Sequence, residues 1–190
     1  MKSDKKQKII ESYNKSSQFY DKRYNLIQRK KFEFSLSQFT YFEKYVLDAG
    51  CGTGLLYEFI SLRENEIHNR FVSVDISIKM LKKLKYKQKI LKNKISISPI
   101  LSDIENIPIR NDVFDATVSF TSLQNLEDVN KGFLELIRVS KSGAEINLSI
   151  LKKDNRIDSL IAFIRPFFID FCRSAHKHLE DVFIKGIVLK

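Results

Sequence analysis

The chain has 190 residues, of which 43% are hydrophobic and 29% are charged, as in a globular protein with one substantial core. The Lys-rich N-terminus carries no signal-peptide pattern and no apolar run is long enough to cross a bilayer, so we expect a cytoplasmic protein. The formal charge of +10 allows an acidic partner such as RNA or an anionic membrane surface, although a general bias towards Lys, Ile and Asn gives the same charge.

The N-terminal region is predicted to be helical. Residues 1–7 are charged and are expected to fray. Beyond them, apolar and aromatic positions predict two short helices separated by a break at residues 14–17, and a further helix over residues 26–42. We assign residues 1–42 to a helical cap that belongs to the same domain as the core, residues 43–190.

A glycine-rich turn follows the first predicted strand, where residues 46–54 read Val-Leu-Asp-Ala-Gly-Cys-Gly-Thr-Gly. A ligand can lie directly against the backbone of Gly50 and Gly52, because these residues have no Cβ atom. The dinucleotide-binding fingerprint would place its third glycine where this chain has Leu55. Asp48 would also repel a pyrophosphate, but it suits a ligand that carries an ammonium group.

A second buried strand is predicted over residues 71–75, and it ends in Asp75. This carboxylate lies about twenty residues beyond the glycine turn, where nucleotide-binding βαβ units place an acceptor for the ribose hydroxyls. Ser77 can cap the helix that follows, while Ile76 and Met80 are placed to touch an adenine or a ribose.

At these residues the chain resembles motif I, and its continuation, of the class I S-adenosylmethionine (SAM)-dependent methyltransferases. Residues 12–21 look like the N-terminal cap of their type 11 group, which includes the quinone-biosynthesis C-methyltransferases. The resemblance implies that Tyr20, or else Tyr13, closes over the methionine end of SAM, although both could be core residues. It covers about residues 12–150 and implies an α/β fold with a doubly wound, mostly parallel, Rossmann-like sheet and an N-terminal helical cap.

Residues 102–120 resemble the next conserved block of that family. The resemblance implies that the Asp103 carboxylate accepts from the adenine amine and that the Ile104 N–H donates to a ring nitrogen. The fourth strand would bring Ser119 to the carboxyl edge of the sheet. The implied cofactor is SAM, with S-adenosylhomocysteine as its product. The implied cofactor contacts are Tyr20, Asp48, Gly50, Cys51, Gly52, Asp75, Ile76, Met80, Asp103, Ile104 and Ser119.

The sequence contains fewer motifs that would identify the methyl acceptor. The Asn/Asp-Pro-Pro-aromatic tetrad typical of enzymes that methylate exocyclic amines is absent after the fourth strand. Residues 123–126 read Leu-Gln-Asn-Leu where many small-molecule relatives have histidine, so no general base is assigned beyond Tyr20 or Glu127 as candidates. A small-molecule acceptor is favoured. The alternatives are an RNA or ribosome-associated methyltransferase, or a SAM-binding protein without transfer activity.

A run of lysines between residues 79 and 94 could bind phosphates, or it could be a solvated helix face. Cys51 and Cys172 are too few for a disulfide framework, which indicates a reducing compartment. No metal site is predicted, because His176 and His178 do not share a helix face and no fourth ligand is visible.

The C-terminal part is predicted to contain a helix from Asp128, a turn and then a strand over residues 145–150. An amphipathic helix over residues 156–171, kinked at Pro166, could cover the sheet, line a pocket or lie on a membrane surface. One last strand is predicted over residues 182–189. Because the family's fold ends in two antiparallel strands, a reduced C-terminal hairpin is expected.

Overall fold

The computed structural model describes residues 4–36, 44–63, 69–91 and 95–190. The end of the helix predicted over residues 26–42 lies outside the described residues, as do Lys92 and Lys94 of the lysine run.

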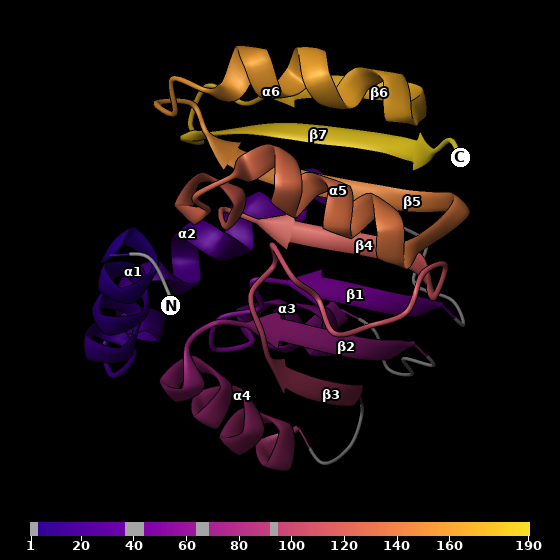
Figure 1. Cartoon of the computed structure of the whole chain (residues 1–190). Coiled ribbons are helices and arrows are strands. Elements are labelled where there is room, and N and C mark those ends of the chain that lie inside the picture. Colours follow the sequence, from indigo (N-terminus) through magenta and orange to yellow (C-terminus); the bar gives the residue numbers. More distant parts are fainter. Residues whose placement is uncertain (1–3, 37–43, 64–68, 92–94) are drawn as a thin grey trace.

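A seven-stranded sheet with the order β3-β2-β1-β4-β5-β7-β6 forms the centre of the structure (Figure 1). Strands β1 to β5 are parallel, and β7 is antiparallel to both of its neighbours, β5 and β6. This arrangement confirms the predicted doubly wound, mostly parallel sheet. The strands are β1 (Tyr45–Ala49), β2 (Arg70–Asp75), β3 (Ser96–Leu101), β4 (Phe114–Phe120), β5 (Ser140–Leu151), β6 (Phe168–Ala175) and β7 (Asp181–Val188).

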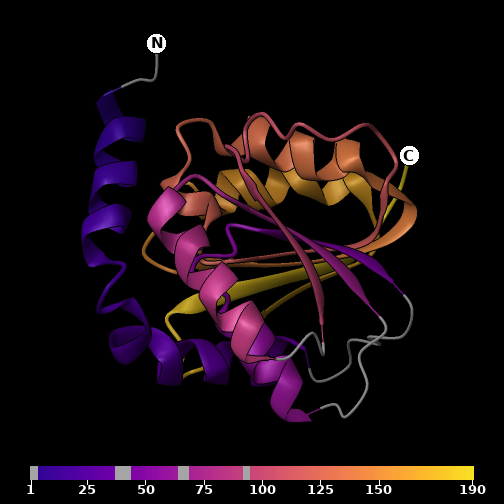
Figure 2. The ribbon, with the colours of Figure 1, turned by 90° about the horizontal axis from the view of Figure 1, so that it is seen from below.

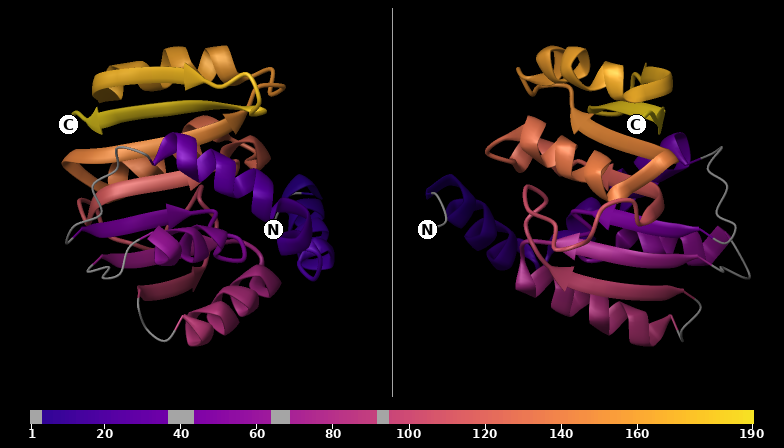
Figure 3. Two further views of the ribbon diagram at one scale, coloured as in Figure 1. Left: turned by 180° about the vertical axis from the view of Figure 1, so that it is seen from behind. Right: turned by 45° about the vertical axis from the view of Figure 1, so that its right-hand side comes forward.

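Helices cover both faces of the sheet, each over its own apolar cluster (Figures 2 and 3). On one face, buried Phe32, Phe59 and Leu84 join α2, α3 and α4 to the strands. On the other face, Leu136 and Leu160 do the same for α5 and α6. The helices are α1 (Asp4–Ser16), α2 (Tyr20–Ser35), α3 (Leu55–Arg63), α4 (Ile78–Ile90), α5 (Val129–Val139) and α6 (Ile157–Ile164), with 3-10 turns at Leu123–Asn125 and Arg165–Phe167.

Local sequence explains where two of these helices begin. The Ser77 hydroxyl accepts from the Met80 N–H at 3.2 Å and caps α4, as predicted. The Asp128 carboxylate accepts from the Lys131 N–H at 2.9 Å and caps α5 in the same way. Each cap satisfies a backbone donor that has no partner within its helix.

The C-terminal hairpin is complete, so the expectation of a reduced hairpin is wrong. The predicted helix over residues 156–171 ends at Ile164, and strand β6 follows the 3-10 turn that contains Pro166. β6 and β7 have 8 residues each. β6 is an edge strand on which only Phe168 is buried, so its sequence lacks the alternation that identifies a strand.

The N-terminal helices also differ from their prediction. Helix α1 begins at Asp4, so residues 4–7 are not frayed, and the break lies at residues 17–19. α1 contains no buried residue and lies beyond the carboxyl ends of the parallel strands (Figure 1). Polar contacts hold it there, including the Ser77 hydroxyl donating to Asn14 Oδ1 at 2.8 Å. In the described parts of the chain, no helix has both the length and the apolarity needed to cross a membrane.

Candidate functional site

A pocket lies at the carboxyl ends of the parallel strands, where open α/β sheets bind their ligands. All of the predicted cofactor contacts line this pocket except Ser119. The Ser119 side chain is fully buried, and its hydroxyl donates to the Ala49 carbonyl at 2.8 Å. It therefore ties β4 to β1.

The glycine turn presents bare backbone to the pocket. Gly50, Gly52 and Gly54 have φ values of 82°, 55° and 81°, in the left-handed region that favours glycine. The N–H groups of Gly50 and Cys51 both donate to the Val74 carbonyl, at 2.7 and 3.1 Å. A Cβ atom added at Gly52 would meet no heavy atom within 4 Å. A ligand can therefore approach the backbone at Gly52.

Asp48 lies under this turn with 3% of its surface exposed. Burial raises the pKa of its carboxyl to about 7; the hydrogen bond from the Tyr57 hydroxyl at 2.9 Å opposes the shift, and the charge of Asp75 adds to it. A positively charged ligand beside this carboxyl would favour its ionised form.

Backbone donors hold Asp75 at the end of β2. Its Oδ2 accepts from the Gly52 N–H at 2.9 Å, and its Oδ1 accepts from the Ser77 N–H at 2.8 Å. Burial raises the pKa of Asp75 against these hydrogen bonds. The carboxylate is thereby tied to the glycine turn on one side and to the start of α4 on the other.

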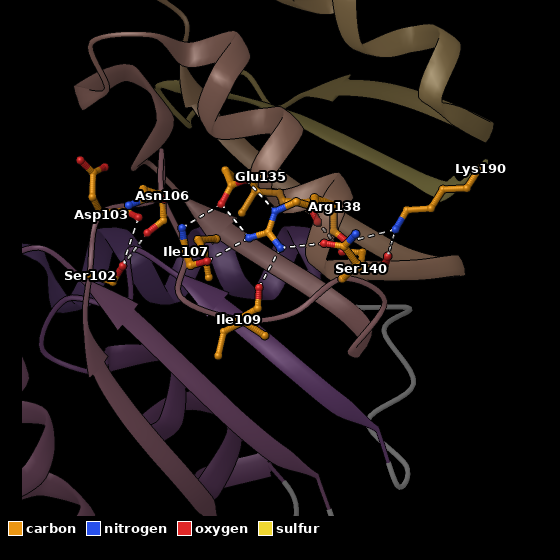
Figure 4. Close-up of polar contacts among 11 residues, drawn as sticks. Ser102, Asp103, Asn106, Ile107, Ile109, Glu135, Arg138, Ser140 and Lys190 are labelled. Carbon is orange, nitrogen blue, oxygen red and sulfur yellow. Dashed lines mark hydrogen bonds and ion pairs between the residues drawn. The ribbon is translucent and has the colours of Figure 1, made fainter.

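Asp103 belongs to a loop that stands where many α/β folds have a helix, and Arg138 of α5 anchors this loop (Figure 4). The Arg138 guanidinium donates to the carbonyls of Ile107 and Ile109 at 2.9 and 2.7 Å. Glu135 accepts from the Ile107 N–H at 2.8 Å. These contacts fix the backbone of the loop close to Asp103.

The Asp103 carboxylate forms an ion pair with Lys6 of α1, whose Nζ lies 2.6 Å from Oδ2. The same ammonium lies 2.9 Å from a carboxylate oxygen of Glu105 and 3.8 Å from one of Glu127. Burial opposes the charge on Lys6, but the bonds to Asp103 and Glu105 raise its pKa. Sequence reasoning missed Lys6, because nothing local to α1 predicts a contact with a loop one hundred residues away.

Hydroxyl and amide groups from α1 and from the segment after β4 also line the pocket. The Asn125 amide donates to the Tyr13 hydroxyl at 2.9 Å, and Thr121 and Ser122 line the same pocket. Burial raises the pKa of both Tyr13 and Tyr20, so both hydroxyls stay protonated near neutral pH. Tyr20 is therefore poorly suited to act as a general base. Among the described residues, no histidine lines the pocket and no cluster of acidic, His or Cys side chains could hold a metal ion.

A buried ion pair lies next to Thr121. Lys31 Nζ of α2 lies 2.6 Å from Asp181 Oδ2 of β7 and donates to the Thr121 hydroxyl at 2.8 Å. Thr121 in turn donates to Asp181 Oδ1 at 2.9 Å. Both charged residues are almost wholly inaccessible to solvent. The network joins α2 to the start of β7 and to the residue after β4. Sequence reasoning did not find it, because Lys31 lies in a generally basic helix.

The residues present fit SAM. The open glycine backbone provides space for a ligand. The carboxylates at the carboxyl ends of β1, β2 and β3 occur in the order expected for an ammonium, a ribose and an adenine amine.

The Methyltransf_11 family model, described as a methyltransferase domain, matches residues 47–147. Malonyl-[acyl-carrier protein] O-methyltransferase of Buchnera aphidicola is 34% identical over 148 residues, which cover 77% of this chain and 55% of that protein. The protein of the same name from Hamiltonella defensa is 32% identical over 153 residues, covering 80% of this chain and 55% of its own length. The chain thus spans about half the length of these curated relatives.

The structure is also similar to that of magnesium protoporphyrin IX methyltransferase from Synechocystis, solved with bound SAM. The TM-score is 0.76 at 15% identity, and the match covers 99% of each chain. The fold is therefore that of the class I methyltransferases. The chain belongs to the methyltransferase type 11 family and has the class I SAM-dependent methyltransferase fold.

Proposed function

We propose that this methyltransferase transfers the methyl group of SAM to a carboxylate oxygen on a small acyl acceptor, of which a malonyl thioester is the best candidate. The observation that carries the proposal is a pocket lined by the hydroxyls of Tyr13 and Tyr20 and the amide of Asn125, with no histidine among the described lining residues. The similarity to curated malonyl-[acyl-carrier protein] O-methyltransferases supports the same acceptor.

The cofactor would lie along the carboxyl ends of the strands. Its methionine end would meet the turn at Gly50 and Gly52, its ribose Asp75, and its adenine Asp103 and the Ile104 N–H. Lys6 would have to leave Asp103, or share it, when an adenine amine binds there, because the ion pair uses one of the carboxylate oxygens. Helices α1 and α2 would serve as the cap of the same domain.

A carboxylate acceptor explains how the reaction proceeds without an assigned base. A carboxyl group with an ordinary pKa near 4 is ionised at neutral pH, so no proton has to be removed before it attacks. SAM supplies a methyl group on a sulfonium that leaves as a neutral thioether. The protein then has to orient the carboxylate in line with the S–CH₃ bond and exclude water, and positioning of this kind supplies about 7–11 kcal/mol in favourable cases.

The hydroxyl and amide groups that line the pocket would provide that orientation. Tyr13 and Tyr20 keep their protons because burial raises their pKa, so their O–H groups can donate to a carboxylate. Donation from neutral groups would hold the acceptor without quenching its nucleophilicity as fully as an ion pair would. The Asn125 amide, which uses one of its two N–H groups on Tyr13, would add a further donor.

An RNA acceptor receives less support from the lysine positions. None of the described lysines of α4 lines the pocket, and Lys87 forms ion pairs with Asp21 and Glu58, each at 2.9 Å. A basic surface that guided RNA to the methyl group would be expected to surround the mouth of the pocket.

Labelled SAM tests the proposal against its alternatives. The purified chain would be incubated with methyl-labelled SAM in three parallel reactions, which contain malonyl-acyl carrier protein, total RNA or no acceptor. We expect label on the malonyl protein alone. Label on RNA would favour the RNA alternative, and SAM binding without transfer to any acceptor would favour a protein that only binds SAM.

A further inference from the structure

Gln28 of α2 carries a buried hydrogen-bond acceptor that the chain does not use. The residue lines the pocket with 8% of its surface exposed. Its Oε1 atom is buried and has no hydrogen-bond partner within the described structure. Buried amide oxygens in folded proteins nearly always accept a hydrogen bond, and an unpaired one destabilises the fold. The unpaired atom therefore points to a donor on a ligand.

The position of Gln28 on its helix shows which part of the pocket it faces. Asp21, Asn25, Gln28 and Phe32 are spaced by four, three and four residues, so they lie along one stripe of α2. Asp21 accepts from the hydroxyl of Thr53 in the glycine turn. The Asn25 amide and the Phe32 ring both contact side chains of α3, the helix that the turn begins. Gln28, between them, faces the glycine turn.

The amide nitrogen of Gln28 interacts with the hydroxyl of Tyr20. A hydrogen bond from Gln28 lowers the pKa of Tyr20 against the larger opposing effect of burial. An amide nitrogen donates and an amide oxygen accepts, so engagement of the nitrogen by Tyr20 leaves Oε1 as the end available to a ligand.

SAM carries three kinds of hydrogen-bond donor: the adenine amine, the ribose hydroxyls and the α-ammonium of its methionine part. Asp103 and Asp75 are the proposed acceptors for the first two, and Asp48 is expected to lie beside the third, whose three N–H groups leave room for a second acceptor. We propose that Gln28 Oε1 accepts a hydrogen bond from the α-ammonium group and so selects ligands that have an amino-acid end. This inference rests on the cofactor of the family and is independent of the acceptor.

Calorimetric titration with two ligands tests this role. S-adenosylhomocysteine has the amino-acid end, whereas 5′-methylthioadenosine keeps the adenosine and the thioether but lacks that end. In Gln28→Leu, we expect binding of S-adenosylhomocysteine to weaken roughly tenfold to a hundredfold, the range of hydrogen bonds to charged groups. Binding of 5′-methylthioadenosine should change by less than about threefold. Gln28→Glu keeps an acceptor and should retain S-adenosylhomocysteine binding.

Two controls separate this role from a structural one. Lys30→Ala, on the exposed side of the same helix, should leave both affinities unchanged. The unliganded Gln28→Leu protein should melt at the wild-type temperature or above it, because an unpaired buried polar atom is removed. Equal weakening of both ligands, no weakening of either, or a large fall in melting temperature would overturn the inference. Failure of the wild type to bind either ligand would overturn it together with the proposed cofactor contacts, without bearing on the acceptor.

Discussion

Binding of S-adenosylhomocysteine is expected to release a proton from Asp48. Burial raises the pKa of this carboxyl to about 7, so much of it is protonated in the unliganded protein near neutral pH. The ammonium group of the ligand, which we place beside the glycine turn, favours the ionised carboxylate by Coulomb attraction. The pKa should therefore fall on binding, and the proton should leave.

The size of the effect follows from that pKa. A carboxyl with a pKa of about 7 is about half protonated at pH 7 and about nine-tenths protonated at pH 6. Up to ~0.5 proton should leave per ligand at pH 7 and up to ~0.9 at pH 6 if binding ionises Asp48 fully. Above about pH 8.5 the release should approach zero, because the carboxylate is already ionised.

Calorimetry in two buffers with different ionisation enthalpies measures this number, because the observed heat contains the heat of protonating the buffer. Asp48→Asn keeps the shape of the side chain and an oxygen that can accept from Tyr57, but it cannot titrate. It should bind ligand without proton release. Equal release from the variant, or none from the wild type between pH 6 and 7, would refute the assignment of the proton to Asp48.

The remaining predictions concern stability and the turn. Because the pKa of Asp48 is raised, its protonated form stabilises the unliganded fold at low pH, and this stabilisation is lost as the pH rises towards 7. The free energy of unfolding of Asp48→Asn, measured by urea titration, should therefore increase relative to that of wild type across this range. Lys31→Met leaves Asp181 buried without its counter-ion and should cost about 3–5 kcal/mol, most of it recovered by adding Asp181→Asn; a cost below about 1 kcal/mol would contradict this reading of the ion pair. Gly50→Ala should abolish S-adenosylhomocysteine binding, because the added Cβ would lie 2.1 Å from the Ser122 hydroxyl oxygen. The control Gly143→Ala has a similar φ, but its added Cβ would meet no heavy atom within 4 Å, so this variant should bind normally.

The glycine turn and the strand-end carboxylates could be predicted because local requirements fix their residue types. Gly50 and Gly52 adopt positive φ, and Asp75 accepts from backbone groups within the same βα unit. The parallel strands could also be predicted, because strands buried on both faces of a sheet are near-continuous apolar runs in the sequence. The structure around such residues can be predicted from a few neighbouring positions in the sequence.

The parts that could not be predicted depend on tertiary contacts. β6 is stabilised by pairing with β7 rather than by an apolar face, so its residues read as the end of a helix. Lys6 and Lys31 look like the many solvated lysines of this basic chain until the fold brings them to Asp103 and Asp181. The unpaired oxygen of Gln28 is visible only once the surroundings of α2 are known.

Chemical identification of the methylated product is the most direct test of a carboxylate acceptor. The purified chain would be given methyl-labelled SAM with malonyl-acyl carrier protein, and acetyl-acyl carrier protein, which lacks the free carboxylate, would serve as the matched control. We expect label on the malonyl protein only, released as methanol by mild alkali as a methyl ester requires. Label that resists alkali, or equal labelling of the acetyl protein, would contradict transfer to a carboxylate oxygen.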